Sequence, residues 1–363
     1  MRLVSTATVE PGAILAKTIY NDKGQVLLSD GVALNERMLK RLLEMGIAYV
    51  YIKDAKTEDI QYKEAFPREL KVKAIKSIES TFHQIQVDAT LSRSFVVERA
   101  SQNFTDIIRQ LHEEIKNNGD LLSILSDVFT YDDYIFTHSF NVTLYSLAIG
   151  MELGLPQKEI ETLGLGAIMH DVGKMKIPTD ILLKPGRLTD EEFQIVKQHP
   201  EDGFRLLKDV HTISLLVAHC AYQHHERING SGYPRGIKGN EIHRFGKIIA
   251  VADVFDAVTS NRVYRKAMLP HDGLEILFAG SGTLFEEEIV NAFRKAVAIY
   301  PVGITVELSD GRKGIVSEQN SGKSDRPKVK ILEKDGLNVT PYELDLMKEL
   351  SVVITGCDTT FSK

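Results

Sequence analysis

The sequence lacks several features that would each define a class of protein. It has no tryptophan, and its two cysteines, Cys220 and Cys357, are far apart and form no CxxC pair. They predict reduced thiols rather than a disulfide framework. No apolar run reaches the roughly 18 residues of a membrane span, and residues 1–5 lack the apolar core of a signal peptide. We therefore expect a cytoplasmic protein that has no contact with the membrane.

A strong excess of charge of one sign is also missing. The 44 basic and 50 acidic residues give a net charge of −6, so the chain as a whole has no affinity for DNA. A polyanionic ligand would need a local cluster of metals, lysines and arginines. Hydrophobic residues make up 43% and charged residues 26%, as in soluble globular proteins. The length of 363 residues predicts two or three domains.

The two ends of the chain predict small β-containing units. Residues 1–53 favour an α/β domain of unknown role, with strands expected at 3–9, 13–19, 25–28 and 48–52 and a helix at 35–45. This stretch has no metal cluster and no glycine-rich phosphate loop, so we favour a scaffold or oligomerisation role over ligand sensing. Residues 300–363 predict a β subdomain, with strands expected at 304–308, 314–317, 328–332 and 352–354.

Helical patterns fill the middle of the chain. Residues 54–126 predict a charged linker followed by packing helices, in which His83 and His112 would be surface side chains. Between residues 127 and 299, polar residues with metal-binding side chains follow one another at intervals of about 25 to 32 residues: His138, His170, Asp171, His199, His224, His225 and Asp253. This spacing suits one ligand group per helix of a bundle, with all groups pointing inward.

The composition of this set indicates a metal centre. Seven ligands are too many for one tetrahedral zinc, but they suit two six-coordinate metals that share Asp171. Imidazole combined with carboxylate favours iron, manganese, nickel or zinc over calcium. Unrelated surface and capping histidines would explain any one of these residues alone, but they do not explain the ordered set.

These residues, with the motifs around them, resemble the HD-GYP phosphodiesterases of the HD superfamily over about Tyr131–Ala298. The matching motifs are His138, His170-Asp171 with Gly173-Lys174, His199-Pro200, His224-His225-Glu226, Gly232-Tyr233-Pro234, Ala252–Ala257 and Asn261–Arg265. The resemblance implies a mainly α-helical HD bundle with a catalytic domain at residues 127–299. It also implies hydrolysis of c-di-GMP to pGpG, and often onward to GMP, with iron or manganese as the metal.

The resemblance implies a role for each metal ligand. Asp171 would bridge the two metals, which would lie roughly 3.5–4 Å apart and hold a bridging hydroxide. The other ligands would divide into two sets, with His138, His170 and Asp253 at one metal and His199, His224 and His225 at the other. A water that is bound in this way is acidic enough to act near neutral pH.

The resemblance also implies residues that touch the substrate. Lys174 would lie against the scissile phosphate and offset the charge of the transition state. Arg262 and Arg265 would bind the second phosphate or a guanine edge through their planar forks of donors. Tyr233 would either stack on a guanine or shape its loop for contact with a partner protein.

Several alternatives stay open at this point. Glu226 would orient an imidazole, and Asp256 would do the same or meet Lys174. The same chemistry could act on 3′,3′-cGAMP or a nucleotide monoester, because the metals and Lys174 recognise only the phosphate group. The chain could instead be a c-di-GMP-responsive adaptor that contacts proteins through the loop of Tyr233 or through the N-terminal domain. A homodimer is a further open question.

The number of metals depends on the residue one helical turn before His138. Some HD-GYP proteins hold a third metal on a glutamate at that position, where this chain has Tyr134. A phenol, with a pKa near 10, is a poor ligand beside a carboxylate. Asp132 and Asp133 point away from that helical face. We therefore expect two metals, with Tyr134 at the edge of the site.

Overall fold

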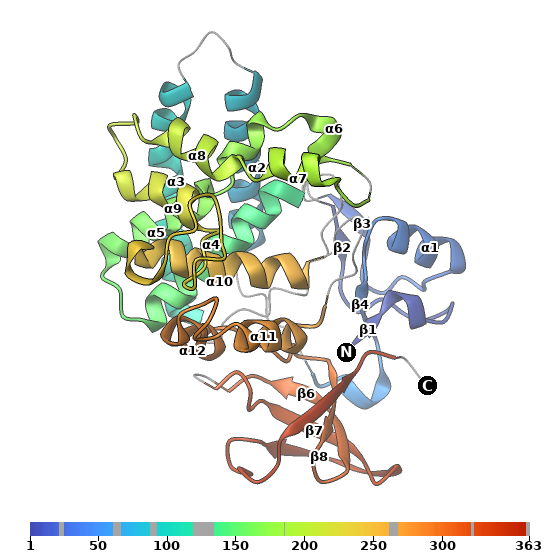
Figure 1. The fold of residues 1–363 in the computed structure, drawn as a ribbon. Coiled ribbons are helices and arrows are strands. Elements are labelled where there is room, and N and C mark those ends of the chain that lie inside the picture. The colour runs from blue at the N-terminus through green and yellow to red at the C-terminus, as the bar shows by residue number, and fades with distance from the viewer. Residues whose placement is uncertain are drawn as a thin grey trace.

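The computed structural model describes residues 1–21, 25–60, 67–87, 93–118, 134–184, 186–260, 268–320 and 323–360. Helices from the middle of the chain pack into a bundle, and short strands occupy both ends (Figure 1). This confirms the expected fold class, which is mainly α with a small β-containing part at each end.

Helix α4 (Tyr134–Glu152) lies at the centre of the bundle. All side chains of residues 136–150 are buried, including the polar ones. The helix packs against α5 (Gln157–Met169), α10 (Arg244–Thr259) and α12 (Glu287–Ala296). A helix enclosed by others in this way can present a polar side chain to a protected interior site.

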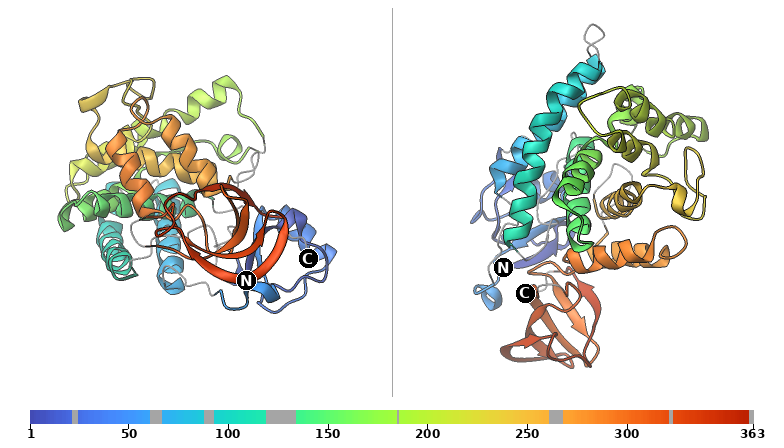
Figure 2. Two further views of the ribbon diagram at one scale, coloured as in Figure 1. Left: turned by 90° about the horizontal axis from the view of Figure 1, so that it is seen from below. Right: turned by 90° about the vertical axis from the view of Figure 1, so that its left-hand side faces the viewer.

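The other helices complete the bundle around α4. They are α2 (Arg68–Val87), α3 (Arg93–Asn118), α6 (Thr179–Leu182), α7 (Asp190–Val196), α8 (His199–Leu207), α9 (Leu215–Gln223) and α11 (Pro270–Ala279). The long α3 runs along one side of the bundle (Figure 2). The packing helices expected within residues 54–126 are described up to Asn118, and residues 119–126 lie outside the described part of the chain.

Helix ends deliver the polar residues to the interior. His170 and Asp171 follow α5 directly, and a 3-10 helix then begins at Val172. Thr189 and Glu192 form a capping box: the Thr189 hydroxyl accepts a hydrogen bond from Glu192 N, and the Glu192 carboxylate accepts one from Thr189 N. This box starts α7, and α8 begins a few residues later at His199.

The N-terminal strands form two small antiparallel pairs. Strand β1 (Arg2–Ser5) pairs with β4 (Tyr49–Ile52), and β2 (Ile19–Tyr20) pairs with β3 (Val26–Leu28). Helix α1 (Glu36–Glu44) begins after Asn35, whose side chain accepts a hydrogen bond from Met38 N. The strand expected at residues 13–19 is shorter than predicted, because residues 14 and 15 make only isolated bridges.

The C-terminal strands form one antiparallel sheet in the order β8-β7-β6-β5-β9. Their bounds are β5 (Thr305–Leu308), β6 (Arg312–Glu318), β7 (Lys328–Lys334), β8 (Leu337–Asp345) and β9 (Ile354–Asp358). The sequence did not predict β8. This strand lies at the edge of the sheet and is mostly exposed, so it lacks the apolar alternation of a half-buried strand, and it can contain Pro341.

The two ends of the chain share a hydrophobic core. Leu3 and Tyr51 belong to the same buried cluster as Val306 of the C-terminal sheet. The Tyr51 hydroxyl donates a hydrogen bond to the carbonyl oxygen of Val302, and Leu3 N donates one to Gly303. The domain limits at residues 53, 126 and 299 stay predictions, but these contacts tie the first segment to the last one.

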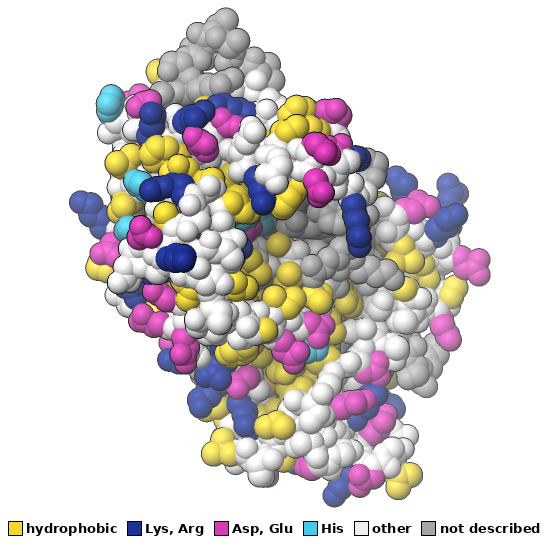
Figure 3. Space-filling view, viewed as in Figure 1, with side chains coloured by type: hydrophobic (Ala, Val, Ile, Leu, Met, Phe, Trp, Pro, Cys, Tyr) yellow, Lys and Arg dark blue, Asp and Glu magenta, His cyan; other side chains and the backbone are white. Residues whose placement is uncertain are grey.

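The surface charges and the hydropathy of the described helices agree with the amino-acid composition. On the face in Figure 3, acidic and basic side chains are interspersed. Among the described helices, none is both long enough and apolar enough to cross a membrane.

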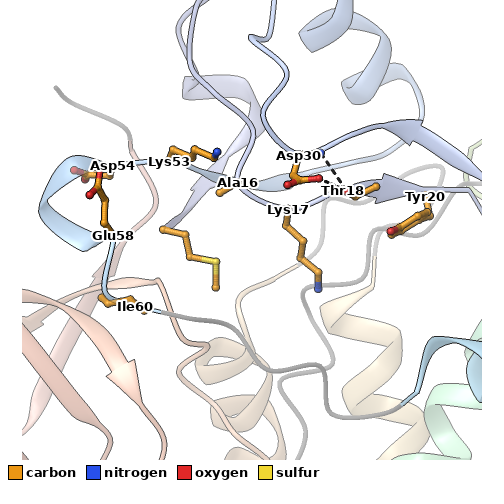
Figure 4. Close-up of a pocket in the computed structure, with 10 residues that line it drawn as sticks. Ala16, Lys17, Thr18, Tyr20, Asp30, Lys53, Asp54, Glu58 and Ile60 are labelled. Atoms are coloured by element: carbon orange, nitrogen blue, oxygen red, sulfur yellow. Dashed lines mark hydrogen bonds between the residues drawn. The ribbon is translucent and has the colours of Figure 1, made fainter.

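A cavity of about 660 Å³ lies beside the N-terminal strands (Figure 4). Its lining combines basic side chains, Lys17 and Lys53, with acidic ones, Asp30, Asp54 and Glu58. These charges largely offset one another, so the lining does not select one class of ligand. A sensory role for this domain therefore stays a hypothesis.

Candidate metal centre

Asp171 stands at the centre of the polar cluster and is fully buried. Its Oδ2 lies 3.5 Å from His138 Nε2 and 3.4 Å from His170 Nε2. Its Oδ1 lies 3.3 Å from His199 Nε2 and 3.7 Å from His224 Nε2. The two oxygens of one carboxylate thus face two different pairs of imidazoles, as the sharing of Asp171 between two metals requires.

Three of the imidazoles are oriented by backbone carbonyl groups. The Nδ1 atoms of His170 and His199 each lie 2.6 Å from the carbonyl oxygen three residues earlier, and that of His224 lies 2.9 Å from Ala221 O. An imidazole that donates its Nδ1 proton to a carbonyl keeps a lone pair on Nε2. This is the usual arrangement around metal-binding histidines.

Contacts of the Nε2 atoms test whether a metal fits. His199 Nε2 and His224 Nε2 lie 3.2 Å apart, and both rings use Nδ1 as the donor, so two lone pairs face each other. His170 Nε2 and Asp171 Oδ1 are buried and have no hydrogen-bond partner. A cation would satisfy all of these atoms at once, whereas leaving them unpaired costs free energy. The residues therefore fit a metal.

Two groups of side chains meet the spatial requirements of metal binding. They are His138, His170 and Asp171 in one group and Asp171, His199, His224 and His225 in the other. Asp253, from α10, touches both groups: its Oδ1 lies 3.1 Å from His138 Nε2, and its Oδ2 lies 3.5 Å from His225 Nδ1. The structure thus brings all seven predicted ligands together.

Carboxylates, rather than backbone groups, surround His138. Asp256 Oδ2 lies 2.6 Å from His138 Nδ1, and its Oδ1 accepts a hydrogen bond from Asn141 Nδ2. Asp256 therefore orients an imidazole, as one of the two expectations had it, and does not meet Lys174. The sequence analysis gave Asn141 no role, although its position three residues after His138 puts it on the same helical face.

Burial and neighbouring charges separate the histidines by pKa. Burial lowers the pKa of His199 to about 4, and it holds those of His224 and His225 well below the usual value. Burial also opposes the charged form of His138, but its hydrogen bonds to Asp253 and Asp256 raise its pKa to about 9. At neutral pH the first three rings are neutral and can bind a cation, whereas His138 carries a proton.

Lys174 reaches the carboxylate at the centre. Its Nζ lies 2.5 Å from Asp171 Oδ2. Burial would raise the pKa of Asp171, but the ammonium of Lys174 and the ring of His170 hold it well below its usual range. Lys174 is thus a basic group that lies directly against the central carboxylate of the cluster.

The loop that carries Gly232-Tyr233-Pro234 packs against His225. The Tyr233 ring is stacked on the imidazole, with ring centroids 4.6 Å apart and planes at 26°. Glu226 was expected to orient an imidazole, but its Oε1 instead accepts a hydrogen bond from Arg235 N in this loop. The chain turns back after His225, so the carboxylate of the next residue points to the loop rather than to the cluster.

Some predicted residues fall outside the described part of the chain. Residues 261–267, which include Arg262 and Arg265, are not described, and neither are Asp132, Asp133 and the side chain of Tyr134. Cys220 is described and is buried, as expected. Lys197 was not predicted from any sequence motif, and its Nζ lies 5.3 Å from the centre of the Tyr233 ring.

The helical bundle and its histidine-aspartate centre define a class of protein. Residues 105–289 match the HD domain family, so the chain belongs to this family. A cyclic di-GMP phosphodiesterase of Pseudomonas aeruginosa is 37% identical over 67% of this chain and 58% of its own length. A cyclic di-GMP phosphodiesterase of Thermotoga maritima is 39% identical over 55% of this chain and 54% of its own. The expected resemblance to HD-GYP phosphodiesterases is thereby confirmed.

A third relative is named for a different substrate. The 3′3′-cGAMP-specific phosphodiesterase 3 of Vibrio cholerae is 34% identical over 46% of this chain and 36% of its own length. The chain therefore spans less than two thirds of the length of each of these relatives.

Proposed function

We propose that this chain is a metal-dependent phosphodiesterase that hydrolyses c-di-GMP to pGpG and, in a second step, to GMP. The observation that carries this proposal is the position of Asp171, whose two oxygens face two different pairs of imidazoles. Such a carboxylate suits two metal ions that act on one phosphodiester. The relatives named as cyclic di-GMP phosphodiesterases support the choice of substrate.

We assign the ligand role to the seven clustered residues, with iron or manganese as the metal and nickel or zinc as alternatives. When bound, two such ions supply an activated water near neutral pH and polarise the phosphodiester. His138, His170, His199 and His224 would hold the metals through Nε2, whereas His225 faces Asp253 through Nδ1. Asp256 keeps His138 in its orientation, and the burial of the cluster excludes bulk water.

The remaining roles concern the substrate. Lys174 offsets the charge that develops on the scissile phosphate, because its ammonium already lies at the edge of the cluster. Arg262 and Arg265 bind the second phosphate or a guanine edge. Replacing Arg262 by Ala should mainly raise the KM for c-di-GMP and leave the metal content unchanged. Loss of metal with an unchanged KM would contradict this assignment.

The decisive experiment joins metal content to turnover. Metal-free protein is loaded separately with Mn²⁺, Fe²⁺ and Ni²⁺, and the products of c-di-GMP are resolved by chromatography. Asp171→Asn should lose bound metal and all hydrolysis, because an amide has one carbonyl oxygen and no charge. Asp202→Asn is a matched control, since Asp202 pairs with Lys176 away from the cluster. Full activity and full metal content in Asp171→Asn would refute the proposal.

A second candidate substrate is 3′,3′-cGAMP, which the similarity to the Vibrio cholerae enzyme favours. Metals and Lys174 recognise phosphate, and both dinucleotides have the same phosphodiester ring. The ratio of kcat/KM for c-di-GMP to kcat/KM for 3′,3′-cGAMP decides between them. A ratio well below one would replace c-di-GMP by 3′,3′-cGAMP as the substrate.

A further inference from the structure

We propose that Tyr233 is a positioning residue for His225: its ring, and the loop that holds it, fix the orientation of this imidazole in the metal centre. The inference deepens the proposed function, since it takes His225 to be a metal ligand. It does not depend on which cyclic dinucleotide the chain hydrolyses. It also gives the Gly232-Tyr233-Pro234 loop a role other than the binding of guanine or of a partner protein.

His225 lacks the restraint that the other four imidazoles have. His138, His170, His199 and His224 each have Nδ1 held by a carboxylate or a backbone carbonyl oxygen. In the described part of the chain, no such hydrogen bond holds His225, and its Nδ1 lies 3.5 Å from Asp253 Oδ2. Its side chain is 17% exposed, whereas the others are at most 1% exposed. The rings of His224 and His199 touch it at 45° and 90°, which leaves the face of the imidazole to another contact.

The Tyr233 ring provides that contact. The two rings lie nearly parallel, at 26°, with their centroids 4.6 Å apart. The phenol ring thus covers one face of the imidazole and restricts its rotation about the bond to Cβ. Stacked aromatic pairs of this kind stabilise each other beyond the effect of the area that they bury. Tyr233 thus takes the part that a carbonyl or carboxylate takes at the other four imidazoles.

The backbone fixes the loop to the same residue. Tyr233 N donates a hydrogen bond of 3.2 Å to the carbonyl oxygen of His225. Gly232 packs so closely that a Cβ there would collide with the His225 carbonyl and with the backbone of Glu226 and Arg227. The buried Glu226 carboxylate accepts a hydrogen bond of 2.8 Å from Arg235 N. The loop is therefore attached to residues 225–227 on both sides of Tyr233.

The surroundings of Tyr233 leave little room for a stacked guanine. His225 covers one face of its ring. The ammonium of Lys197 lies 5.3 Å from the ring centroid and 4.9 Å from that of Phe193, and no carboxylate pairs with it among the described residues. A cation held near an aromatic ring is attracted by its electron-rich face. A purine that approaches the Tyr233 ring therefore meets a cation beside it.

The test separates metal affinity from substrate affinity. Metal-free protein is titrated with Mn²⁺, and free Mn²⁺ is followed by electron paramagnetic resonance, without substrate. Tyr233→Leu should weaken one Mn²⁺ site about tenfold, the range found for residues that orient metal ligands. Tyr233→Phe keeps the ring and should keep the wild-type affinity. At saturating Mn²⁺, the KM for c-di-GMP should be the same in all three proteins.

Two further variants guard against misfolding and general loss of packing. Tyr222→Leu is the matched control, because Tyr222 is a half-buried tyrosine stacked on Phe204 (4.8 Å, 24°) rather than on a histidine. It should leave the Mn²⁺ affinity unchanged. If Tyr233→Leu does not fold, Gly232→Ala tests the same loop, because the added Cβ pushes it away from His225. It should weaken the same Mn²⁺ site.

The outcomes are distinguishable from a failure of the proposed function. If Tyr233→Leu raises KM and leaves Mn²⁺ binding intact, Tyr233 contacts the substrate and the positioning role is overturned. An unchanged Mn²⁺ affinity and an unchanged KM overturn it as well. If the wild type does not hydrolyse c-di-GMP but Tyr233→Leu still weakens Mn²⁺ binding, the positioning role stands and only the proposed substrate fails.

Discussion

Asp256 Oδ2 lies 2.6 Å from His138 Nδ1, deep inside the bundle. This carboxylate comes from α10 and the imidazole from α4, so the contact fixes two helices together as well as one ring. Asp256 also accepts hydrogen bonds from Asn141 and Ser260, which keep its oxygens in place. The contact has a chemical consequence, because it raises the affinity of His138 for a proton.

We predict that metal binding to the metal-free chain releases a proton from His138. Burial opposes the charged imidazole, but hydrogen bonds to Asp253 and Asp256 raise its pKa to about 9. The ring is therefore protonated at neutral pH, and a metal must displace that proton. The affinity of one metal site should rise about tenfold per pH unit between pH 7 and 9 and then level off. Calorimetric titration in buffers of different ionisation enthalpy measures the released proton.

The control for this prediction is Asp256→Asn. It removes one carboxylate that raises the pKa of His138, so the rise in affinity should end at a lower pH. His199 has a pKa of about 4, and those of His224 and His225 are also lowered by burial, so these rings release no proton above neutral pH. An affinity that does not change between pH 7 and 9 would contradict the role of His138.

We predict that Lys174→Ala slows turnover and does not reduce the metal content. The ammonium contacts Asp171 Oδ2 and competes with a metal for it, so its removal cannot weaken metal binding through charge. The kcat should fall about 10²- to 10³-fold, as when one group that stabilises transition-state charge is lost. Lys176→Ala is the matched control, because Lys176 pairs with Asp202 at 2.7 Å. Metal content per chain and kcat are measured for both. A large loss of metal in Lys174→Ala would show that this residue supports the site itself.

The sequence predicted which side chains would cluster, because their residue types and order constrain them strongly. His170 and Asp171 follow a helix that had been predicted from its apolar positions, and their neighbours in space come from other helix ends. The sequence could not predict which atoms orient the rings. The carbonyl of Ala221 leaves no pattern in the residue types. Tyr233 stands in a recognisable motif, but the motif does not say that its ring stacks on His225.

The fold was predicted less evenly than the site. Helices with a clear apolar face were predicted to within a few residues, as for α1, which was expected at 35–45 and spans Glu36–Glu44. The edge strand β8 was missed because most of its side chains are exposed. Glu226 was assigned to the wrong neighbour, because a sequence gives no indication that the chain folds back at Gly232. Contacts that depend on the path of a loop are the ones that the sequence did not reveal.

We predict that Gly173→Ala damages the metal centre through packing. A Cβ at Gly173 would collide with the carbonyl oxygen of His199 and with Gly203 N, so α8 must move away. Overpacking of this kind costs about 1–3 kcal/mol, and it shifts His199 relative to Asp171. Thermal unfolding should show a lower Tm, and the metal content should fall. Gly356→Ala is the control, since a Cβ there meets only the end of the Glu307 side chain at 3.5 Å. An unchanged Tm for Gly173→Ala would contradict the observed packing.

The last prediction is the number of metals, which we expect to be two per chain. Asp171 has two oxygens, and each faces one pair of imidazoles, so the described ligands divide into two groups. A third ion would need a carboxylate one helical turn before His138, where the chain has Tyr134. Asp133 and Asp132 stand five and six residues before His138 in the sequence, a spacing that does not match one helical turn. Elemental analysis of the loaded protein gives the number of metal ions per chain, and anomalous scattering from a crystal locates the ions.

Tyr134→Glu should add a third ion, because it introduces a carboxylate at the required position. A third ion in the wild type, held by Asp132 or Asp133, would refute this prediction.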